Sequence, residues 1–320
     1  MRLLTRKEIN QIPDLKPMID GVLDKGTVAM LAAQPGAGKS FLALDWACCY
    51  ATRKDWQSRT TSNTVGAGTN IHAGGKVLYI AAEGARGMKA RLNAWERTWD
   101  TQVPDSRFRL LAQPVNLGNM TEVMALCKLI KEEGPFGLLI IDTLARCTMG
   151  LEENNATEMG RVIQAAYMIR TAMGVDGTVL LIHHQGKSGA VRGSSALLGG
   201  VDLMLTLSND HGHLVLEDEK RKDGKPMGEV TLKLEESHGS MVISSDANDT
   251  THNNPLVPLM QQVQQLLPMS RSELKMAIDM QDRLIYSCLA HGIKAGYILA
   301  TNDKNPRYSL SSKGLEYKLM

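Results

Sequence analysis

One eight-residue stretch, Ala-Gln-Pro-Gly-Ala-Gly-Lys-Ser at 33–40, restricts what this chain can fold into more than any other part of the sequence. It follows the apolar run 27–32, which is typical of a buried strand, and it precedes the run 41–47, which is typical of a helix. A strand, a glycine-rich turn and Gly-Lys-Ser at the start of a helix predict a phosphate-binding loop, because small residues let backbone N–H groups surround a triphosphate. Ala33 stands where this pattern usually has its first glycine, and its side chain is still small.

The loop predicts a role for its polar residues. Lys39 is expected to neutralise the β- and γ-phosphates, and Ser40 is expected to ligate Mg²⁺. ATP and Mg²⁺ are therefore the expected ligands. The residues expected to contact the nucleotide here are Gln34, Pro35, Gly36, Ala37, Gly38, Lys39, Ser40 and Phe41.

Composition limits the class of protein. Of the 320 residues, 43% are hydrophobic and 22% are charged, which is typical of a soluble globular chain long enough for two domains. No apolar run approaches the ~18 residues of a membrane span, and the N-terminus lacks a secretory signal. Five cysteines without a CxxC pair indicate reduced thiols in a cytoplasmic protein. A net charge of +2 neither favours nor excludes nucleic acid as a partner.

Apolar strand-like runs alternate with helical patterns between residues 26 and 244. This alternation predicts an α/β core whose mostly parallel sheet is covered on both faces. Strands are expected near 27–32, 76–82, 107–112, 137–142, 178–183 and 201–207, with helices near 39–51, 86–99, 119–133 and 154–174. Shorter runs near 214–217, 229–234 and 240–244 predict antiparallel strands at one edge.

The remaining segments differ in composition. Residues 1–25 form an N-terminal segment, the polar stretch 57–75 is expected to be a flexible surface insertion, and 245–254 is expected to be a linker. Residues 255–320 show three helical patterns followed by strands at 297–300 and 307–310, which resembles a winged helix-turn-helix domain. Eight Lys/Arg against five Asp/Glu from Leu256 onward make this part only mildly basic, so duplex DNA and partner proteins both stay open as its ligands.

Polar residues at the ends of predicted strands are expected to complete the nucleotide site, because ligands bind at the C-terminal edge of such sheets. Glu83 is a candidate for polarising the water that attacks the γ-phosphate. Asp142 fits the acid that positions Mg²⁺. His183 or His184 is a candidate γ-phosphate contact, and a buried structural histidine is the alternative.

The glycine-rich loop 186–195 follows these histidines. Its Lys187, Arg192 and Ser194 are candidates for gripping a nucleic-acid backbone next to the presumed phosphate sensor. An ordinary surface loop is the alternative interpretation.

The region 19–234 resembles the RecA-like ATPase core, and within it the hexameric RepA-type helicases of plasmids and phages, which are related to the DnaB replicative helicases. The resemblance is carried by the motifs at 33–40, 78–84 with 91–95, 138–146, 182–187 and 192–197. It implies that Glu83 is the catalytic base, that Asp142 is the Walker B acid and that one of the two histidines senses the γ-phosphate.

The resemblance also implies that ATP lies between subunits of a homo-oligomer, expected to be a hexamer. Helicases of this type supply basic fingers in trans from a Lys-x-Arg-x-Gly stretch, and the matching residues here are Lys220, Arg221 and Lys222. Lys222 stands at the arginine position, with Arg221 beside it, so the identity of the finger stays open.

The resulting hypothesis is an ATP-driven motor on single-stranded DNA in phage or plasmid replication, with other replication proteins as further partners and no membrane association. Two alternatives use the same core. One is a recombination ATPase or mediator that forms filaments, and the other is a helicase loader or regulator that binds DNA through its C-terminal domain.

Overall fold

The computed structural model describes residues 3–11, 15–57, 59, 75–186, 192–245, 269–277, 289, 293, 298–301, 303 and 306–311. The chain divides into two compact units, Met1–Asp246 and Ala247–Met320, and the division falls inside the expected linker 245–254. Most of the expected insertion 57–75 lies outside the described residues.

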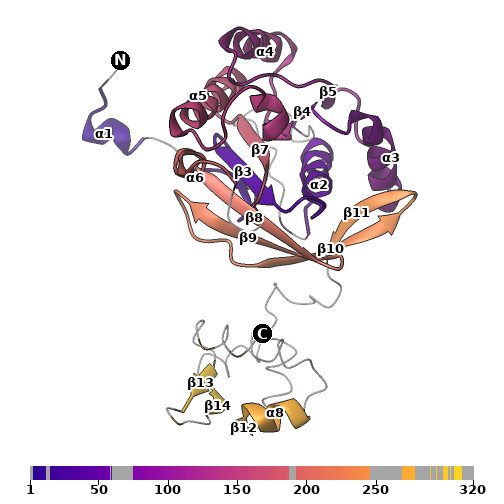
Figure 1. The fold of residues 1–320 in the computed structure, drawn as a ribbon, viewed down its shortest axis with the longest axis vertical. Helices are drawn as coiled ribbons and strands as arrows, with labels where there is room; N and C mark the ends of the chain where they lie inside the picture. Colours follow the sequence, from indigo (N-terminus) through magenta and orange to yellow (C-terminus); the bar gives the residue numbers. More distant parts are fainter. Residues whose placement is uncertain are drawn as a thin grey trace. The chain divides into compact units, whose positions relative to one another are not determined.

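A nine-stranded sheet organises the first unit, in the order β11-β10-β9-β8-β3-β7-β6-β4-β5 (Figure 1). Neighbouring strands from β8 to β5 run parallel, whereas β8, β9, β10 and β11 pair antiparallel. The strands are β3 (Val28–Ala33), β4 (Val77–Ala81), β5 (Phe108–Leu111), β6 (Leu138–Asp142), β7 (Thr178–His184), β8 (Leu203–Asp210), β9 (His213–Arg221), β10 (Val230–Ser237) and β11 (Ser240–Ser245). The predicted mostly parallel α/β core with an antiparallel edge is confirmed.

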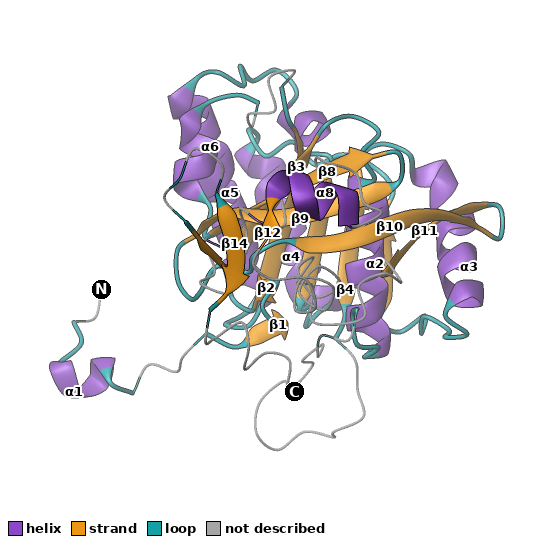
Figure 2. Ribbon diagram, turned by 90° about the horizontal axis from the view of Figure 1, so that it is seen from below, coloured by secondary structure: helices purple, strands orange, loops and turns teal. Residues whose placement is uncertain are grey.

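Helices cover both faces of this sheet, because its central strands are apolar on both sides. Along β3, Ala29, Leu31 and Ala33 pack in one core cluster, and the alternate residues pack in the other. The first face carries α2 (Lys39–Thr52) and α3 (Met88–Thr98), and the second carries α4 (Met120–Glu133), α5 (Ala156–Met173) and the short α6 (Ser195–Gly200) (Figure 1). The hairpin of β10 and β11 curves toward α3, where the Thr98 and Ser237 hydroxyls are 2.8 Å apart (Figure 2).

Part of the N-terminal segment packs into the core of the first unit. After α1 (Arg6–Ile9), the strands β1 (Pro17–Ile19) and β2 (Leu23–Asp24) form a two-stranded sheet. Met18, Ile19, Val22 and Leu23 of this hairpin are completely buried in the first core cluster. The core unit therefore starts earlier than the predicted residue 26. Two short 3₁₀ helices, η1 (Ala85–Gly87) and η2 (Leu144–Thr148), follow β4 and β6.

The second unit is described only in part. It contains α8 (Arg271–Ala277) and a three-stranded sheet of β12 (Met269–Ser270), β14 (Arg307–Leu310) and β13 (Ile298–Ala300). The predicted cap of α8 is present as reciprocal bonds: Ser270 N donates to Glu273 Oε2 (2.7 Å), and Glu273 N donates to Ser270 Oγ (3.4 Å). The predicted helix 256–267 and almost all of 280–290 lie outside the described residues, so the winged helix stays a prediction.

In the part of the chain that the structure describes, no helix is both long and apolar enough to cross a bilayer.

Candidate active site

The phosphate loop leaves β3 near the middle of the sheet and enters α2 directly. Gly36 and Gly38 have φ angles of +78° and +97°, which residues with a side chain rarely adopt. A Cβ on Gly38 would lie 3.3 Å from Leu234 Cδ2, whereas a Cβ on Gly36 would meet no atom within 4 Å. The loop is therefore packed against β10 on one side and open on the other, as a concave anion site requires.

Lys39 is 5% exposed and folds back onto the loop that carries it. Its Nζ donates to the carbonyl oxygens of Ala33 (3.0 Å) and Gln34 (2.8 Å). Burial lowers the pKa of Lys39 to about 8, against the opposing effect of the Asp142 and Glu83 carboxylates. The ammonium thus has only neutral acceptors, and a phosphate group would give it an anionic partner.

Asp142 ends β6 and is 3% exposed. Its Oδ2 accepts a hydrogen bond of 2.6 Å from the Tyr79 hydroxyl, while its Oδ1 is buried with no partner among the described residues. Burial raises the pKa of Asp142, and the hydrogen bond from Tyr79, the nearby Ser40 hydroxyl and the charge of Arg91 lower it. An orphan carboxylate oxygen beside Ser40 suits Mg²⁺. No group of three His, Cys, Asp or Glu able to hold a metal occurs in the described ranges.

Glu83 follows β4 at the same edge of the sheet. Thr143 Oγ1 donates to Glu83 Oε1 (2.9 Å), and Arg146 Nε lies 3.4 Å from Glu83 Oε2. The carboxylate is partly exposed, and its charge acts on the pKa values of Lys39 and Asp142. The structure therefore brings together the predicted base, the predicted Mg²⁺ acid and the phosphate-loop lysine.

The two histidines at the end of β7 face different partners, because side chains alternate along a strand. Burial and the positive charge of Lys39 lower the pKa of His184, and in the sheet His184 pairs with Ala33, where the phosphate loop begins. His183 is 1% exposed, and its Nε2 lies 2.9 Å from the carbonyl oxygen of Arg192; burial lowers its pKa also. His184 is thus the neutral side chain near the expected γ-phosphate, and His183 contacts the end of the following loop.

The residues expected to bind nucleic acid lie at that loop. Arg192 has an exposed side chain whose Nε is 2.9 Å from Glu153 Oε2. Ser194 is the N-cap of α6, and its hydroxyl accepts from Ala196 N (3.1 Å). This cap uses one acceptor lone pair of the Ser194 hydroxyl and leaves its O–H donor available, so its role as a nucleic-acid contact stays a prediction. Lys187 lies outside the described residues.

Two of the three residues expected to act in trans are engaged inside their own chain. Lys220 Nζ donates to three carbonyl oxygens at the end of α6, those of Leu198 (2.8 Å), Gly199 (2.9 Å) and Val201 (2.8 Å). These bonds neutralise the C-terminal end of that helix.

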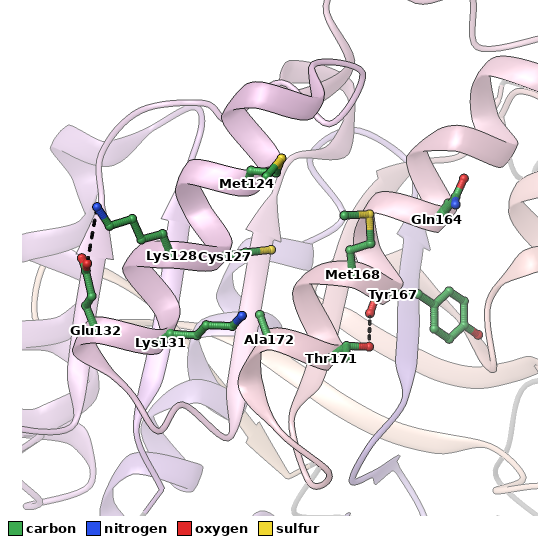
Figure 3. Close-up of a pocket in the computed structure, with 10 residues that line it drawn as sticks. All are labelled: Met124, Cys127, Lys128, Lys131, Glu132, Gln164, Tyr167, Met168, Thr171 and Ala172. Carbon is green, nitrogen blue, oxygen red and sulfur yellow. Dashed lines mark hydrogen bonds and ion pairs between the residues drawn. The ribbon is translucent and has the colours of Figure 1, made fainter. Parts of the chain in front are cut away.

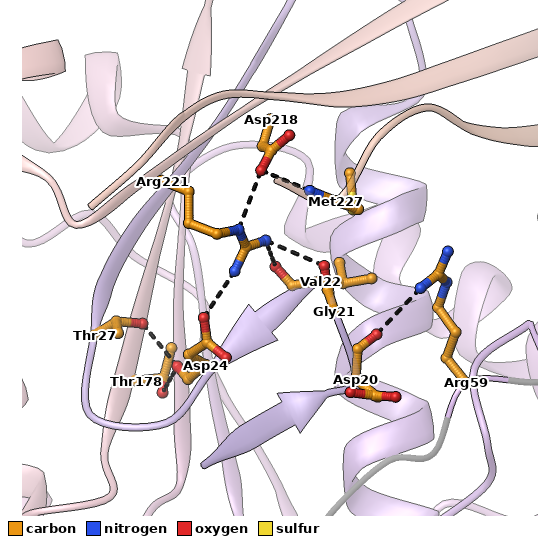
Figure 4. Close-up of polar contacts among 10 residues, drawn as sticks. All are labelled: Asp20, Gly21, Val22, Asp24, Thr27, Arg59, Thr178, Asp218, Arg221 and Met227. Carbon is orange, nitrogen blue, oxygen red and sulfur yellow. Dashed lines mark hydrogen bonds and ion pairs between the residues drawn. The ribbon is translucent and has the colours of Figure 1, made fainter. Parts of the chain in front are cut away.

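Arg221 is still more enclosed, with a side chain that is 7% exposed. Its guanidinium pairs with Asp24 Oδ2 (2.8 Å) and Asp218 Oδ2 (3.1 Å), and it donates to the carbonyl oxygens of Gly21 and Val22, both at 3.1 Å (Figure 4). The prediction that Arg221 reaches a neighbouring subunit conflicts with this network. Lys222, 63% exposed and 3.5 Å from Asp202 Oδ1, is the basic side chain of this stretch that reaches solvent.

Several contacts of the site were not predicted. Tyr79 donates a hydrogen bond to Asp142, and Thr143 donates one to Glu83. Tyr79 and Thr143 both lie in the motifs named above, but the sequence gives no indication of these contacts. Arg91 lies over the Phe41 ring at 4.7 Å from its centroid. Gln34 Nε2 donates to the carbonyl oxygen of Gly186 (2.5 Å), which connects the phosphate loop to the loop after β7.

A separate groove of about 730 Å³ lies between α4 and α5 (Figure 3). Met124, Cys127 and Lys128 line it on α4, and Tyr167 and Met168 line it on α5. None of the predicted site residues contributes to it.

Comparison with known proteins identifies a family. No curated protein matches the chain. A KaiC-like protein from the hyperthermophilic archaeon Pyrococcus horikoshii OT3 superposes with a TM-score of 0.46 and 14% sequence identity, over 71% of this chain and 93% of that one. Residues 1–190, more than half of the chain, match the AAA domain family AAA_25. The protein belongs to this family of P-loop ATPases.

Proposed function

We propose that the protein is an ATP-driven oligomeric motor, a hexameric helicase that acts on single-stranded DNA in phage or plasmid replication. The observation that carries the proposal is the connection between the phosphate loop and the segment after β7. Gln185 N donates to the carbonyl oxygen of Ala33 (2.9 Å), and Gln34 Nε2 donates to that of Gly186 (2.5 Å). At the far end, Arg192 N donates to the carbonyl oxygen of His184 (3.3 Å). The segment expected to hold DNA thus starts and ends on the nucleotide site.

The residues of the site divide the chemistry among them. Glu83 accepts a proton from water, whose oxygen attacks the γ-phosphorus of ATP as the bond to the bridging oxygen breaks and ADP leaves. Lys39 neutralises charge on the phosphate oxygens, and His184 donates its N–H to a γ-phosphate oxygen as a neutral imidazole. Ser40 and Asp142 would hold Mg²⁺, which supplies charge neutralisation between the β- and γ-phosphates.

The neighbouring subunit completes the site in this proposal. Lys222 supplies the positive charge in trans, because its ammonium reaches solvent while Lys220 and Arg221 are held by their own chain. An ammonium gives a single-point contact instead of the bidentate contact of a guanidinium, so turnover is expected to be slow.

The test measures ATP hydrolysis by the full chain with and without single-stranded DNA, together with unwinding of a forked duplex. Stimulation by DNA, fork unwinding and loss of both in Lys39→Ala support the proposal. Equal hydrolysis with and without DNA, in a protein that never unwinds a fork, would refute it. Mass photometry with ATP and DNA distinguishes a closed hexamer from the open-ended filaments of a recombination ATPase.

A further inference from the structure

A carboxylate in the turn before α5 holds Arg192 at its guanidinium. Arg192 Nε lies 2.9 Å from Glu153 Oε2. The Glu153 side chain is 21% exposed and that of Arg192 is 63% exposed. The carboxylate is therefore the enclosed partner, and the guanidinium extends from it into solvent.

The backbone around Arg192 is held at the same place. Ser194 N donates to the carbonyl oxygen of Glu153 (2.8 Å). Gly193 has a φ of +90°, and a Cβ there would lie 2.8 Å from that same carbonyl oxygen, so no side chain fits between the two segments. On the other side, His183 Nε2 lies 2.9 Å from the carbonyl oxygen of Arg192. The backbone of Arg192 is thus held in place at the same site as its guanidinium.

The mode of contact leaves the phosphate-binding edge of the guanidinium accessible. Arginine has five N–H donors, and the Glu153 carboxylate forms its ion pair on the Nε side of the guanidinium. The Nη groups of Arg192 have no hydrogen-bond partner among the residues that the structure describes. Those Nη groups can form the parallel donor pair that binds a phosphate group.

We infer that Glu153 is a positioning residue that holds the Arg192 guanidinium by Nε and presents its Nη groups to a phosphate of a nucleic-acid backbone. The inference rests on the proposed DNA contact of the 186–195 segment, and it adds a residue that no sequence motif indicates. The direction in which DNA affinity changes when Glu153 is neutralised tests this inference. Removing a negative charge near a polyanion site strengthens binding if charge alone matters, whereas loss of positioning weakens it.

The test measures binding of the full chain to labelled oligo-dT by fluorescence anisotropy, over a range of salt concentrations, with a non-hydrolysable ATP analogue present. We expect Glu153→Gln to weaken binding about threefold and Glu153→Ala to weaken it more, because Gln keeps the length of the side chain and an oxygen beside Nε, whereas Ala removes both. The slope of log K against log salt should fall toward that of Arg192→Ala, which loses about 0.7 for one phosphate contact. Glu152→Gln is the matched control, because Glu152 is the adjacent residue and is exposed. This variant should bind oligo-dT as tightly as the wild type or more tightly.

Two results would overturn the inference. One is Glu153→Gln binding at least as tightly as Glu152→Gln with an unchanged salt slope. The other is a Glu153→Gln effect of equal size in an Arg192→Ala background, because a residue that acts through Arg192 has no effect without it. Failure of the underlying function looks different: Arg192→Ala would then bind like the wild type, or the wild type would not bind oligo-dT, and both proposals would fall together.

Discussion

The affinity of the protein for nucleotide should depend on the protonation state of Lys39. In the protein alone its pKa is about 8, because burial disfavours the ammonium form and its hydrogen-bond acceptors are neutral carbonyls. A triphosphate in the loop favours the charged form, so the pKa of Lys39 rises in the complex. Binding near pH 8 therefore takes up a proton. The affinity should be nearly constant below about pH 7 and fall as the pH rises through 8, because the free protein must first protonate Lys39.

The size of this effect follows from the pKa. At pH 8 the ammonium is half formed in the free protein and fully formed in the complex, so binding should take up about half a proton. Its protonated fraction falls from about 0.9 at pH 7 to about 0.1 at pH 9, which raises Kd about tenfold, or about 1.4 kcal/mol.

Isothermal titration calorimetry with a non-hydrolysable ATP analogue, in two buffers of different ionisation enthalpy, counts the protons. Lys39→Arg should bind without proton uptake, because a guanidinium stays charged at every pH used. His184→Gln should keep the uptake, since the pKa of that histidine is already lowered from 6.5 by burial. A wild-type protein that takes up no proton at pH 8 and shows the same Kd at pH 7 and pH 9 would refute the reasoning.

Three further outcomes are expected. Asp45 is fully buried with a pKa raised to about 7, so the free energy of unfolding should fall as pH rises from about 4 to about 7 and then level off. Asp45→Asn should remove that fall, as measured by urea unfolding at pH 5 and pH 8. An equal change in the free energy of unfolding in the wild type and in the variant would contradict this prediction. Arg221→Ala should cost about 3–5 kcal/mol in the same assay, because it leaves buried acids unpaired, while the exposed Lys222→Ala should cost under about 1 kcal/mol; equal losses would argue against the described network. Glu83→Gln should keep nucleotide binding and lower hydrolysis by about 10²-fold or more, measured by fluorescent-nucleotide titration and phosphate release; loss of binding itself would mean that Glu83 is not the base.

Much of the fold follows from local pattern, because buried parallel strands are continuous apolar runs and their helices show clear periodicity. The order from β3 to β11 and the clustering of Lys39, Glu83 and Asp142 could be predicted for this reason. The hairpin of β1 and β2 could not, since its strands of three and two residues are too short to show a period. Burial of Met18 and Val22 in the core decides its position instead.

The basic stretch 220–222 marks the limit of such prediction at the site. In sequence its three cations are equivalent, and their roles differ only through partners far away in the chain. Lys220 meets the carbonyl end of α6, and Arg221 meets Asp24, 197 positions away. The division of roles between His183 and His184 has the same origin, because it depends on which side of β7 faces the phosphate loop.

The hydrogen bond from Gln34 to Gly186 has a thermodynamic consequence. Together with the bond from Gln185 N to the carbonyl oxygen of Ala33, it makes the phosphate loop and the start of the next loop one mechanical element. Any ligand that shifts this element by binding at one end must change the binding free energy at the other end, and the change is equal in both directions. A measurement of how a nucleotide alters the second ligand's affinity therefore fixes, without a second experiment, how that ligand alters the affinity for the nucleotide.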